Sequence, residues 1–339
     1  MPHESAPLLS VGLSWCQSGH RVAIATVVKT WGSSPRQAGS LLVICDSGDF
    51  VGSVSGGCIE GAVIAAAQKT MSDGASQLLS FGVTQDMAWE VGLACGGRVE
   101  VWVERADPEQ LQRLVTALAR RQPLVVVTSL ATGQQQVLEH PDQAASMVSI
   151  PATLASACRD AFARDAASDV ELSDGQRFFL WPLLPALRLL IVGAVHTAQP
   201  LSQMAMQCDL DVTVIDPRTA FATESRFPSV TLCKEWPEPA LERLGLDRRT
   251  ALVTLTHDPK LDEPPLAIAL RSEAFYIGAL GSGRTHATRL QRLREQGFSD
   301  DSLSRIQGPI GLRIGARSPA EIAVSILAQL ISVLRRECP

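Results

Sequence analysis

The residue whose surroundings point most clearly to a chemical role is Cys58, in the stretch GSVSGGCIEG at positions 52–61. A predicted helix begins directly after it, and the N–H groups and dipole of a helix N-terminus stabilise a thiolate. Ser55, Gly56 and Gly57 precede it, and glycines let the backbone approach a bulky ligand closely. A buried, inert cysteine beside a tight turn is the alternative, but the flanking glycines favour a ligand contact.

A second cysteine, Cys95, has its two glycines on the other side. It precedes Gly96 and Gly97 at the start of a predicted strand, in the stretch GLACGGR. Two cysteines in glycine-rich loops can converge on one site that contacts a soft metal centre or passes sulfur between partners. Zinc is the alternative metal. Neither cysteine belongs to a CxxC pair and no histidine lies nearby in sequence, so the spacing does not favour a structural zinc site.

A third loop, KTWGSSPRQAG at positions 29–39, contains Arg36 and follows a predicted strand. Its hydroxyl groups, its guanidinium and the backbone N–H groups that its glycines leave accessible could donate hydrogen bonds to a phosphate or a pterin. Trp31 is the aromatic residue in this loop that could stack on a flat ring. A solvated turn between two strands is the simpler interpretation, so this loop by itself is weak evidence.

In the second half of the chain, Gly193 ends a predicted strand and opens a helix, where a nucleotide-binding fold places its phosphate loop. Asp216 ends the next strand, where such folds bind a ribose hydroxyl. However, Val195 replaces the second glycine of the GxGxxG fingerprint, and that glycine admits the pyrophosphate. The pattern therefore predicts a Rossmann-like fold but argues against NAD(P) as its ligand.

Further polar residues lie at the predicted carboxyl ends of strands in the same half. Because these ends line the ligand crevice of parallel sheets, we predict ligand contacts there from His196, Arg218, His257, Asp258, Gly281, Ser282 and Arg284. Such residues also cap helices when no ligand is present, and the sequence leaves the two roles evenly balanced.

The elements that position these residues divide the chain at about residue 185. Residues 1–184 are predicted as a mixed α+β domain that contains both cysteine motifs, with half-buried strands such as 98–104 and helices such as 59–71. Residues 185–339 alternate strands and helices, which predicts an α/β domain with a Rossmann-like, doubly wound parallel sheet. A last helix is predicted over 319–336, with Ser318 as its cap and Glu321 completing a capping box.

Composition excludes several classes of protein. The chain has 339 residues, of which 46% are hydrophobic and 19% charged, as in folded globular proteins. A net charge of -5 argues against a general nucleic-acid or membrane binder. The N-terminus has no signal-peptide pattern and no apolar run is long enough to span a membrane, so we expect a cytoplasmic protein whose eight cysteines are thiols.

These motifs together resemble the XdhC/CoxI family of molybdenum-hydroxylase accessory proteins. In the first domain the resemblance rests on TVVKTWGSSPRQAGS, VGSVSGGCIEGAV and WEVGLACGGRVEVWVE. In the second it rests on LIVGAVHTA, VTVIDPR, LTHDP, YIGALGSGRTHATRL and GPIGLRIGARSPAEIAVSILAQLI. Several long motifs in the same order over nearly the whole chain make the resemblance specific. One departure is Val195, where the family commonly has glycine.

The resemblance implies a protein that binds the molybdenum cofactor in its molybdopterin form. It implies support for cofactor sulfuration with a cysteine desulfurase, delivery to an apoenzyme such as xanthine dehydrogenase, and a homodimer. On this interpretation Cys58 and Cys95 contact molybdenum or transferred sulfur, and Arg36 and the neighbouring glycines hold the pterin phosphate. Whether the chain itself catalyses a reaction stays open; we expect a cofactor-binding chaperone.

Two other functions remain as alternatives. The first is an NAD(P)-dependent oxidoreductase that uses the Rossmann-like domain, which the replaced glycine at Val195 disfavours. The second is a zinc-dependent thiol enzyme, which would contain stoichiometric zinc and which the ligand spacing disfavours.

Overall fold

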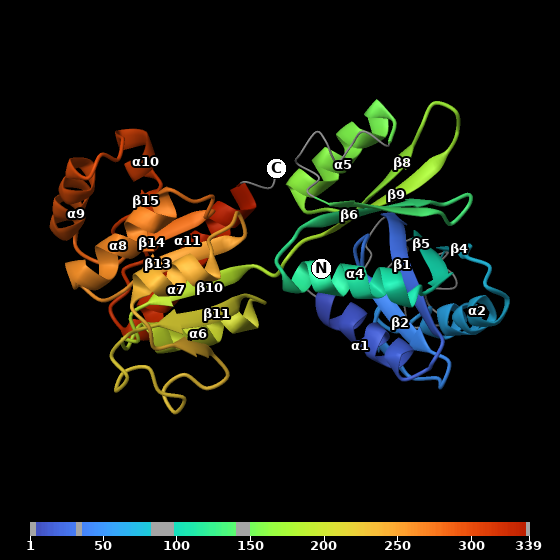
Figure 1. The fold of residues 1–339 in the computed structure, drawn as a ribbon, viewed down its shortest axis with the longest axis horizontal. Coiled ribbons are helices and arrows are strands. Elements are labelled where there is room, and N and C mark those ends of the chain that lie inside the picture. Colours follow the sequence, from blue (N-terminus) through green and yellow to red (C-terminus); the bar gives the residue numbers. More distant parts are fainter. Residues whose placement is uncertain (1–4, 32–35, 83–97, 140–149, 337–339) are drawn as a thin grey trace. The chain divides into compact units, whose positions relative to one another are not determined.

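The computed structural model describes residues 5–31, 36–82, 98–139 and 150–336, and it divides into two compact units, residues 1–185 and 186–339 (Figure 1). The elements of the first unit are α1 (Ser5–Gln17), β1 (Val22–Trp31), β2 (Leu41–Cys45), β3 (Phe50–Gly52), α2 (Glu60–Asp73), β4 (Gln77–Gly82), β5 (Arg98–Arg105), α4 (Pro108–Ala119), β6 (Leu124–Ser129), β7 (Gln135–Glu139), α5 (Ala152–Arg164), β8 (Ser168–Glu171) and β9 (Arg177–Leu183).

The first unit contains two antiparallel sheets, with strand orders β3-β2-β1-β5-β4 and β7-β6-β9-β8. Alternating side chains of β1 and β5 point to opposite faces. One face, with Ala23, Ala25 and Val101, packs on α2. The other face, with Ile24 and Trp102, shares a core with α1, α4 and the second sheet. Figure 1 shows α1 and α4 side by side in this layer.

The second sheet is covered on its remaining face by α5, whose Leu154, Cys158 and Phe162 are buried against it. A charged network also ties the two sheets together. Asp169 of β8 accepts hydrogen bonds from Lys29 and Arg177, both at 2.9 Å, and Arg177 reaches Glu100 at 2.8 Å. The two sheets therefore form a single layered domain.

The second unit is an alternation of strands and helices. Its elements are β10 (Arg188–Val192), α6 (Ala198–Gln207), β11 (Asp211–Ile215), β12 (Thr231–Cys233), α7 (Pro237–Leu244), β13 (Thr250–Thr254), α8 (Pro259–Leu270), β14 (Tyr276–Ala279), α9 (Gly283–Glu295), α10 (Asp300–Ser304), β15 (Ile306–Gln307) and α11 (Pro319–Arg336).

All pairings in this unit are parallel, and the strand order is β12-β11-β10-β13-β14-β15. Leu189 and Ile191 of β10 pack towards α6 and α11 on one face. Leu190 and Val192 pack towards α7 and α8 on the other. This is the predicted doubly wound Rossmann-like sheet, and its switch point lies between β10 and β13, where the chain turns to opposite sides.

The prediction for the last helix is confirmed in detail. The helix α11 spans Pro319–Arg336, as predicted. Glu321 accepts hydrogen bonds from the N–H groups of Arg317 and Ser318, at 2.7 and 3.0 Å, and its own N–H donates to Ser318 Oγ at 3.3 Å. None of the helices within the described ranges combines the length and the apolar character that a bilayer span requires.

Candidate functional site

The direction of α2 places Cys58 at one particular end of the five-stranded sheet. The guanidinium of Arg21, which directly precedes β1, donates to the carbonyl of Met71 near the end of α2. Because α2 packs along β1 and β5, its beginning lies towards the other end of β1, where that strand finishes at Trp31. The loop that carries Cys58 is therefore at the Trp31 end of the sheet.

The other two sequence motifs attach to this same end. Arg98, the first residue of β5, is paired with Trp31 and with Gly82, the last residue of β4. The predicted residues Cys95, Gly96 and Gly97 directly precede Arg98 and lie outside the described residues. The loop with Arg36 follows Trp31 directly, and Arg36 itself is partly exposed. Strand register thus brings Trp31, Gly82 and Arg98, the described residues next to two of these motifs, to one end of the sheet.

The Cys58 loop is organised by a carboxylate that the sequence prediction left without a role. Glu60 accepts hydrogen bonds from four consecutive backbone N–H groups, those of residues 54–57, at 3.2, 2.9, 3.2 and 2.9 Å. The hydroxyls of Ser53 and Ser55 also donate to it, at 2.7 and 2.5 Å. The glycine-rich loop is therefore folded around an anion that belongs to the chain.

Two opposing effects set the charge of Glu60. Burial is the largest and raises its pKa, but the hydrogen bonds from Ser55 and Ser53 and from the backbone outweigh it and lower the pKa to about 2. Glu60 is thus ionised at neutral pH. Cys58, two residues earlier, is exposed, and its N–H donates to Ser55 Oγ at 3.0 Å. The signal in the sequence was a carboxylate in the first turn of a helix after a glycine-rich loop.

Trp31 offers a flat surface at the same end of the sheet. Its side chain is 41% exposed, and the ammonium of Lys29 lies 5.1 Å from its ring centre. Lys29 is engaged by Asp169, and Arg177 by Asp169 and Glu100. This end of the sheet therefore carries several cations, among them the partly exposed Arg36 and the exposed Arg98.

In the Rossmann-like unit, Gly193 is required by internal packing. Its φ is +105°, and a Cβ placed on it would lie 2.5 Å from Thr256 Cγ2 in the loop after β13. The N–H of the next residue, Ala194, donates to Asp216 Oδ2 at 2.8 Å. The first amide of the expected phosphate loop is thus already bound within the protein, and Val195 follows it as the sequence indicated.

Asp216 is fully buried and has internal partners on both oxygens. The guanidinium of Arg218 donates to Oδ1 and Oδ2 at 2.9 and 2.8 Å, and the Arg218 N–H donates to Oδ1 at 2.9 Å. Burial raises the pKa of Asp216, but the hydrogen bonds from Arg218 and Ala194 outweigh this and hold it below the usual range. The ribose contact predicted for this carboxylate would have to displace the guanidinium of Arg218.

The loop after β13 has a strained backbone at the switch point of the sheet. His257 has a φ of +72°, and its N–H donates to Asp262 Oδ2 at 3.0 Å. Asp258 caps α8 by accepting the N–H of Lys260 at 3.0 Å, and Pro259 takes the first position of that helix. Strained residues that persist are common in sites, and the exposed His196 lies on the loop that follows the adjacent strand β10.

The loop after β14 lies above a buried cation. Ser282 caps α9 by accepting the N–H of Thr285 at 3.1 Å, Gly281 packs against Thr285, and Arg284 is exposed. Arg289 is buried beneath this loop, where its Nη2 donates to the carbonyl of Leu280 at 2.9 Å and lies 3.8 Å from Asp262 Oδ2. Sequence gave no signal for this pair, because α9 has the composition of a solvated helix.

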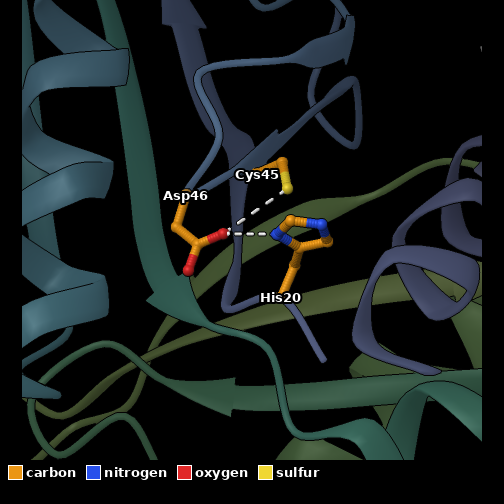
Figure 2. A group of neighbouring side chains, drawn as sticks. All are labelled: His20, Cys45 and Asp46. Atoms are coloured by element: carbon orange, nitrogen blue, oxygen red, sulfur yellow. Dashed lines mark hydrogen bonds and ion pairs between the residues drawn. The ribbon is translucent and has the colours of Figure 1, made fainter. Parts of the chain in front are cut away.

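A different group of side chains could in principle hold a metal ion. His20, Cys45 and Asp46 each place a ligand atom within 4.8 Å of the others, and Figure 2 shows them directed at one another. However, Asp46 already accepts from His20 Nδ1 at 2.9 Å and from the N–H and Nε of Arg21 at 3.2 and 3.3 Å. The hydrogen bond from His20, then those from Arg21, lower the pKa of Asp46 to about 2. This arrangement is therefore an ion-paired turn. The guanidinium of Arg21 would repel a metal cation at the same carboxylate.

The chain matches two family models in the order of its two units. Residues 15–82 match the model described as the XdhC and CoxI family, and residues 189–330 match the model described as the XdhC Rossmann domain. The chain is also similar to a solved structure described as a xanthine dehydrogenase from Bacillus halodurans. The TM-score is 0.69 at 23% identity, over 97% of this chain and 96% of that one, which shows a shared fold.

Two curated relatives extend over most of the chain. The molybdenum cofactor insertion chaperone PaoD of Escherichia coli (strain K12) is 27% identical over 96% of this chain and 87% of its own length. A protein of Bacillus subtilis (strain 168), named as a probable xanthine dehydrogenase subunit, is 27% identical over 92% of this chain and 93% of its own. With both of its characteristic domains matched in order, the chain is a member of the XdhC/CoxI family.

Proposed function

We propose that this protein binds the molybdopterin form of the molybdenum cofactor and hands it to a molybdenum hydroxylase such as xanthine dehydrogenase. The observation that carries the proposal is the exposed thiol of Cys58, which an ordered loop holds. This loop lies at the same end of the five-stranded sheet as Arg98, the residue that follows the Cys95 segment. The names of the two curated relatives, a cofactor insertion chaperone and a xanthine dehydrogenase subunit, support the same role.

The residues at this edge fit such a ligand in chemical type. A thiolate is a soft donor and suits molybdenum or sulfur, and the exposed ring of Trp31 offers an apolar surface for a pterin. Arg36 and Arg98 supply the positive charge that a pterin phosphate requires. When bound, the cofactor supplies the molybdenum on which an oxo ligand is exchanged for sulfur, and Cys58 and Cys95 would hold that group in place.

The partners follow from this role. A cysteine desulfurase would supply sulfur, and an apoenzyme of the hydroxylase class would receive the loaded cofactor. We place the protein in the cytoplasm, as a homodimer, and regard it as a carrier whose turnover depends on its partners. Of the contact residues proposed in the Rossmann-like unit, His196, His257, Asp258, Gly281, Ser282 and Arg284 would form a second contact surface for the cofactor, while Gly193 and Asp216 with Arg218 would support the loop from inside.

An NAD(P)-dependent oxidoreductase is the weaker proposal. Ribose recognition needs a carboxylate with accessible lone pairs, whereas Asp216 is fully buried and bound by Arg218 and Ala194. Val195 also removes the glycine that admits a pyrophosphate. If this protein bound NAD(P)H with micromolar affinity, the loop at Gly193 would have to rearrange.

The test is a titration of the anaerobically prepared cofactor into the purified protein, with the Cys58→Ala, Cys95→Ala double variant and a Cys208→Ala control. Cys208 is exposed, as Cys58 is, but lies in the other unit. We expect the double variant to lose at least tenfold in affinity and the control to match the wild type. If the double variant keeps wild-type affinity, the thiols are not the contact; if the wild type does not bind, the proposed function fails.

A further inference from the structure

We propose that Glu60 is a positioning residue which fills the anion site of the glycine-rich loop, so that the loop presents the Cys58 thiol to a soft ligand and withholds its N–H groups from phosphate. The identity of the ligand rests on the proposed function. The closure of the loop by Glu60 concerns the chain alone and is tested separately.

The first argument is the convergence of donors on one carboxylate. Consecutive backbone N–H groups that point to one side form a nest, which binds anions such as phosphate. Here the N–H groups of residues 54–57 all donate to Glu60, together with the hydroxyls of Ser53 and Ser55. A phosphate at the same place would have to expel Glu60 or accept a second negative charge beside it.

The second argument is the path from Glu60 to Cys58. Ser55 Oγ donates to Glu60 and accepts the N–H groups of Cys58 and Ile59, at 3.0 and 3.1 Å. Ser53 Oγ likewise donates to Glu60 and accepts the N–H of Gly56 at 2.8 Å. Each serine hydroxyl therefore donates its proton to the carboxylate and accepts backbone N–H groups of the loop. Glu60 thus orients the two hydroxyls that hold the loop backbone.

The consequence for ligand choice is specific. With its anion site filled, the loop has the exposed Cys58 side chain as its reactive group, and a thiolate prefers a soft metal or sulfur over a hard anion. The phosphate of a pterin ligand must then be held by cations elsewhere on this edge. We therefore assign Gly56 and Gly57 to loop closure, in place of the phosphate contact that their sequence pattern suggested.

The experiment is amide hydrogen exchange of the full chain as wild type, Glu60→Gln and the matched control Glu109→Gln. Glu109 is an exposed carboxylate in the first turn of α4, so its variant has the same change in charge and helix dipole. A glutamine NH₂ group cannot accept, so Glu60→Gln must lose part of the ring of bonds. We expect the amides of residues 54–57 to exchange at least tenfold faster in Glu60→Gln and at the wild-type rate in Glu109→Gln.

A chemical rescue tests the same point with a different variant. In Glu60→Ala the empty nest should accept formate, which would slow exchange at residues 54–57 again. Ser55→Ala should instead accelerate exchange mainly at Cys58 and Ile59, because it removes only the connecting hydroxyl. The proposal is overturned if residues 54–57 exchange at the wild-type rate in Glu60→Gln, or if formate leaves Glu60→Ala unchanged.

The ligand part is tested by cofactor affinity and by the rate of Cys58 alkylation at a fixed pH, followed on the Cys58 peptide by mass spectrometry. We expect Glu60→Gln to weaken cofactor binding at least fivefold and to change the alkylation rate, while Glu60→Asp recovers part of both. If inorganic phosphate competes with Glu60 in the wild type and protects Cys58, the loop is a phosphate site and the assignment is wrong. Failure of the wild type to bind cofactor would remove the proposed function but leave the exchange result standing.

Discussion

Two glycine-rich loops in the described part of the chain, one at Cys58 and one at Gly193, are each closed by a carboxylate, but in different ways. Glu60 belongs to its own loop and receives two hydroxyl and four backbone donors. Asp216 comes from the neighbouring strand, binds one amide of the Gly193 loop and is neutralised by Arg218. The Cys58 loop is thus encoded locally and keeps an exposed thiol, whereas the Gly193 loop depends on the assembled sheet.

This difference shows that a glycine-rich turn does not by itself indicate an open phosphate site. At Gly193 the missing side chain makes room for Thr256 in the loop after β13, and at Gly57 it permits a φ of +123° beside open space. One glycine serves the packing of a sheet and the other serves the turn itself. The following predictions separate these roles, from the largest expected effect to the smallest.

Asp216→Asn should destabilise the second unit by about 3 kcal/mol, because a buried NH₂ group cannot accept the hydrogen bonds that one carboxylate oxygen receives and the half-exposed Arg218 loses its counter-ion. Because the folded pKa of Asp216 is lowered from 3.8, the contribution of the ionised group is fully present above pH ~5 and is lost as the pH falls below about 4. Urea unfolding of wild type and variant between pH 3 and pH 7 measures this. A difference that stays constant to pH 3 would contradict the assignment.

Gly193→Ala should cost about 2–4 kcal/mol, since the new Cβ would clash with Thr256 Cγ2 and the residue has a positive φ. Thr256→Ser removes Cγ2 but keeps the hydroxyl that donates to Asp262. The double variant should therefore recover part of the loss in thermal unfolding. Strict additivity of the two changes would show that the contact with Thr256 is not the cause.

Gly57→Ala should cost only about 1–2 kcal/mol, because no atom lies within 4 Å of the added Cβ and backbone strain is the sole penalty. The effect should be concentrated in the Cys58 loop, where faster exchange of the N–H that Gly57 donates to Glu60 would reveal it. A loss of stability as large as that of Gly193→Ala would remove the distinction between the two glycines.

The smallest effect is expected in zinc affinity, for a substitution at Asp46. The carboxylate of Asp46 also closes a turn, with His20 and Arg21 as its donors. We expect wild type and Asp46→Asn to have the same zinc affinity in calorimetric titration, since a guanidinium already occupies this carboxylate. Weaker binding in Asp46→Asn would make the His20, Cys45 and Asp46 group a metal site after all.

The sequence predicted the architecture of the second unit well because its strands are buried on both faces. The predicted strand Arg188–Val192 is apolar after its first residue, is followed directly by Gly193, and coincides with β10. The strand β15, Ile306–Gln307, was missed because two residues give no periodic signal. In the first unit β3, β4 and β8 were missed for a related reason: they are short or half-exposed strands at sheet edges.

The candidate site was predictable in its residues but not in its partners. Cys58 was identified from its neighbours, because local chemistry signals a reactive thiol. That Glu60 binds the loop, that Arg218 neutralises Asp216 and that Arg289 lies beside Asp262 are properties of folded geometry. Arg289 and Asp262 lie on different helices and leave no trace in one sequence, since each alone resembles an ordinary surface charge. Glu60 and Arg218 are close to their partners in sequence, but only the folded backbone decides which groups they bind.

The position of β9 has a consequence for how the chain is made. This strand lies between β6 and β8 in the second sheet, and its Arg177 joins Glu100 of the first. A protein synthesised from its N-terminus folds domain by domain, so the first unit can close only after Leu183 has emerged, a few residues before the second unit begins at Ala186. Until then the core that β1 and β6 share lacks Phe179, Trp181 and Leu183 of β9, and this is the stage of synthesis at which a bound chaperone would matter most.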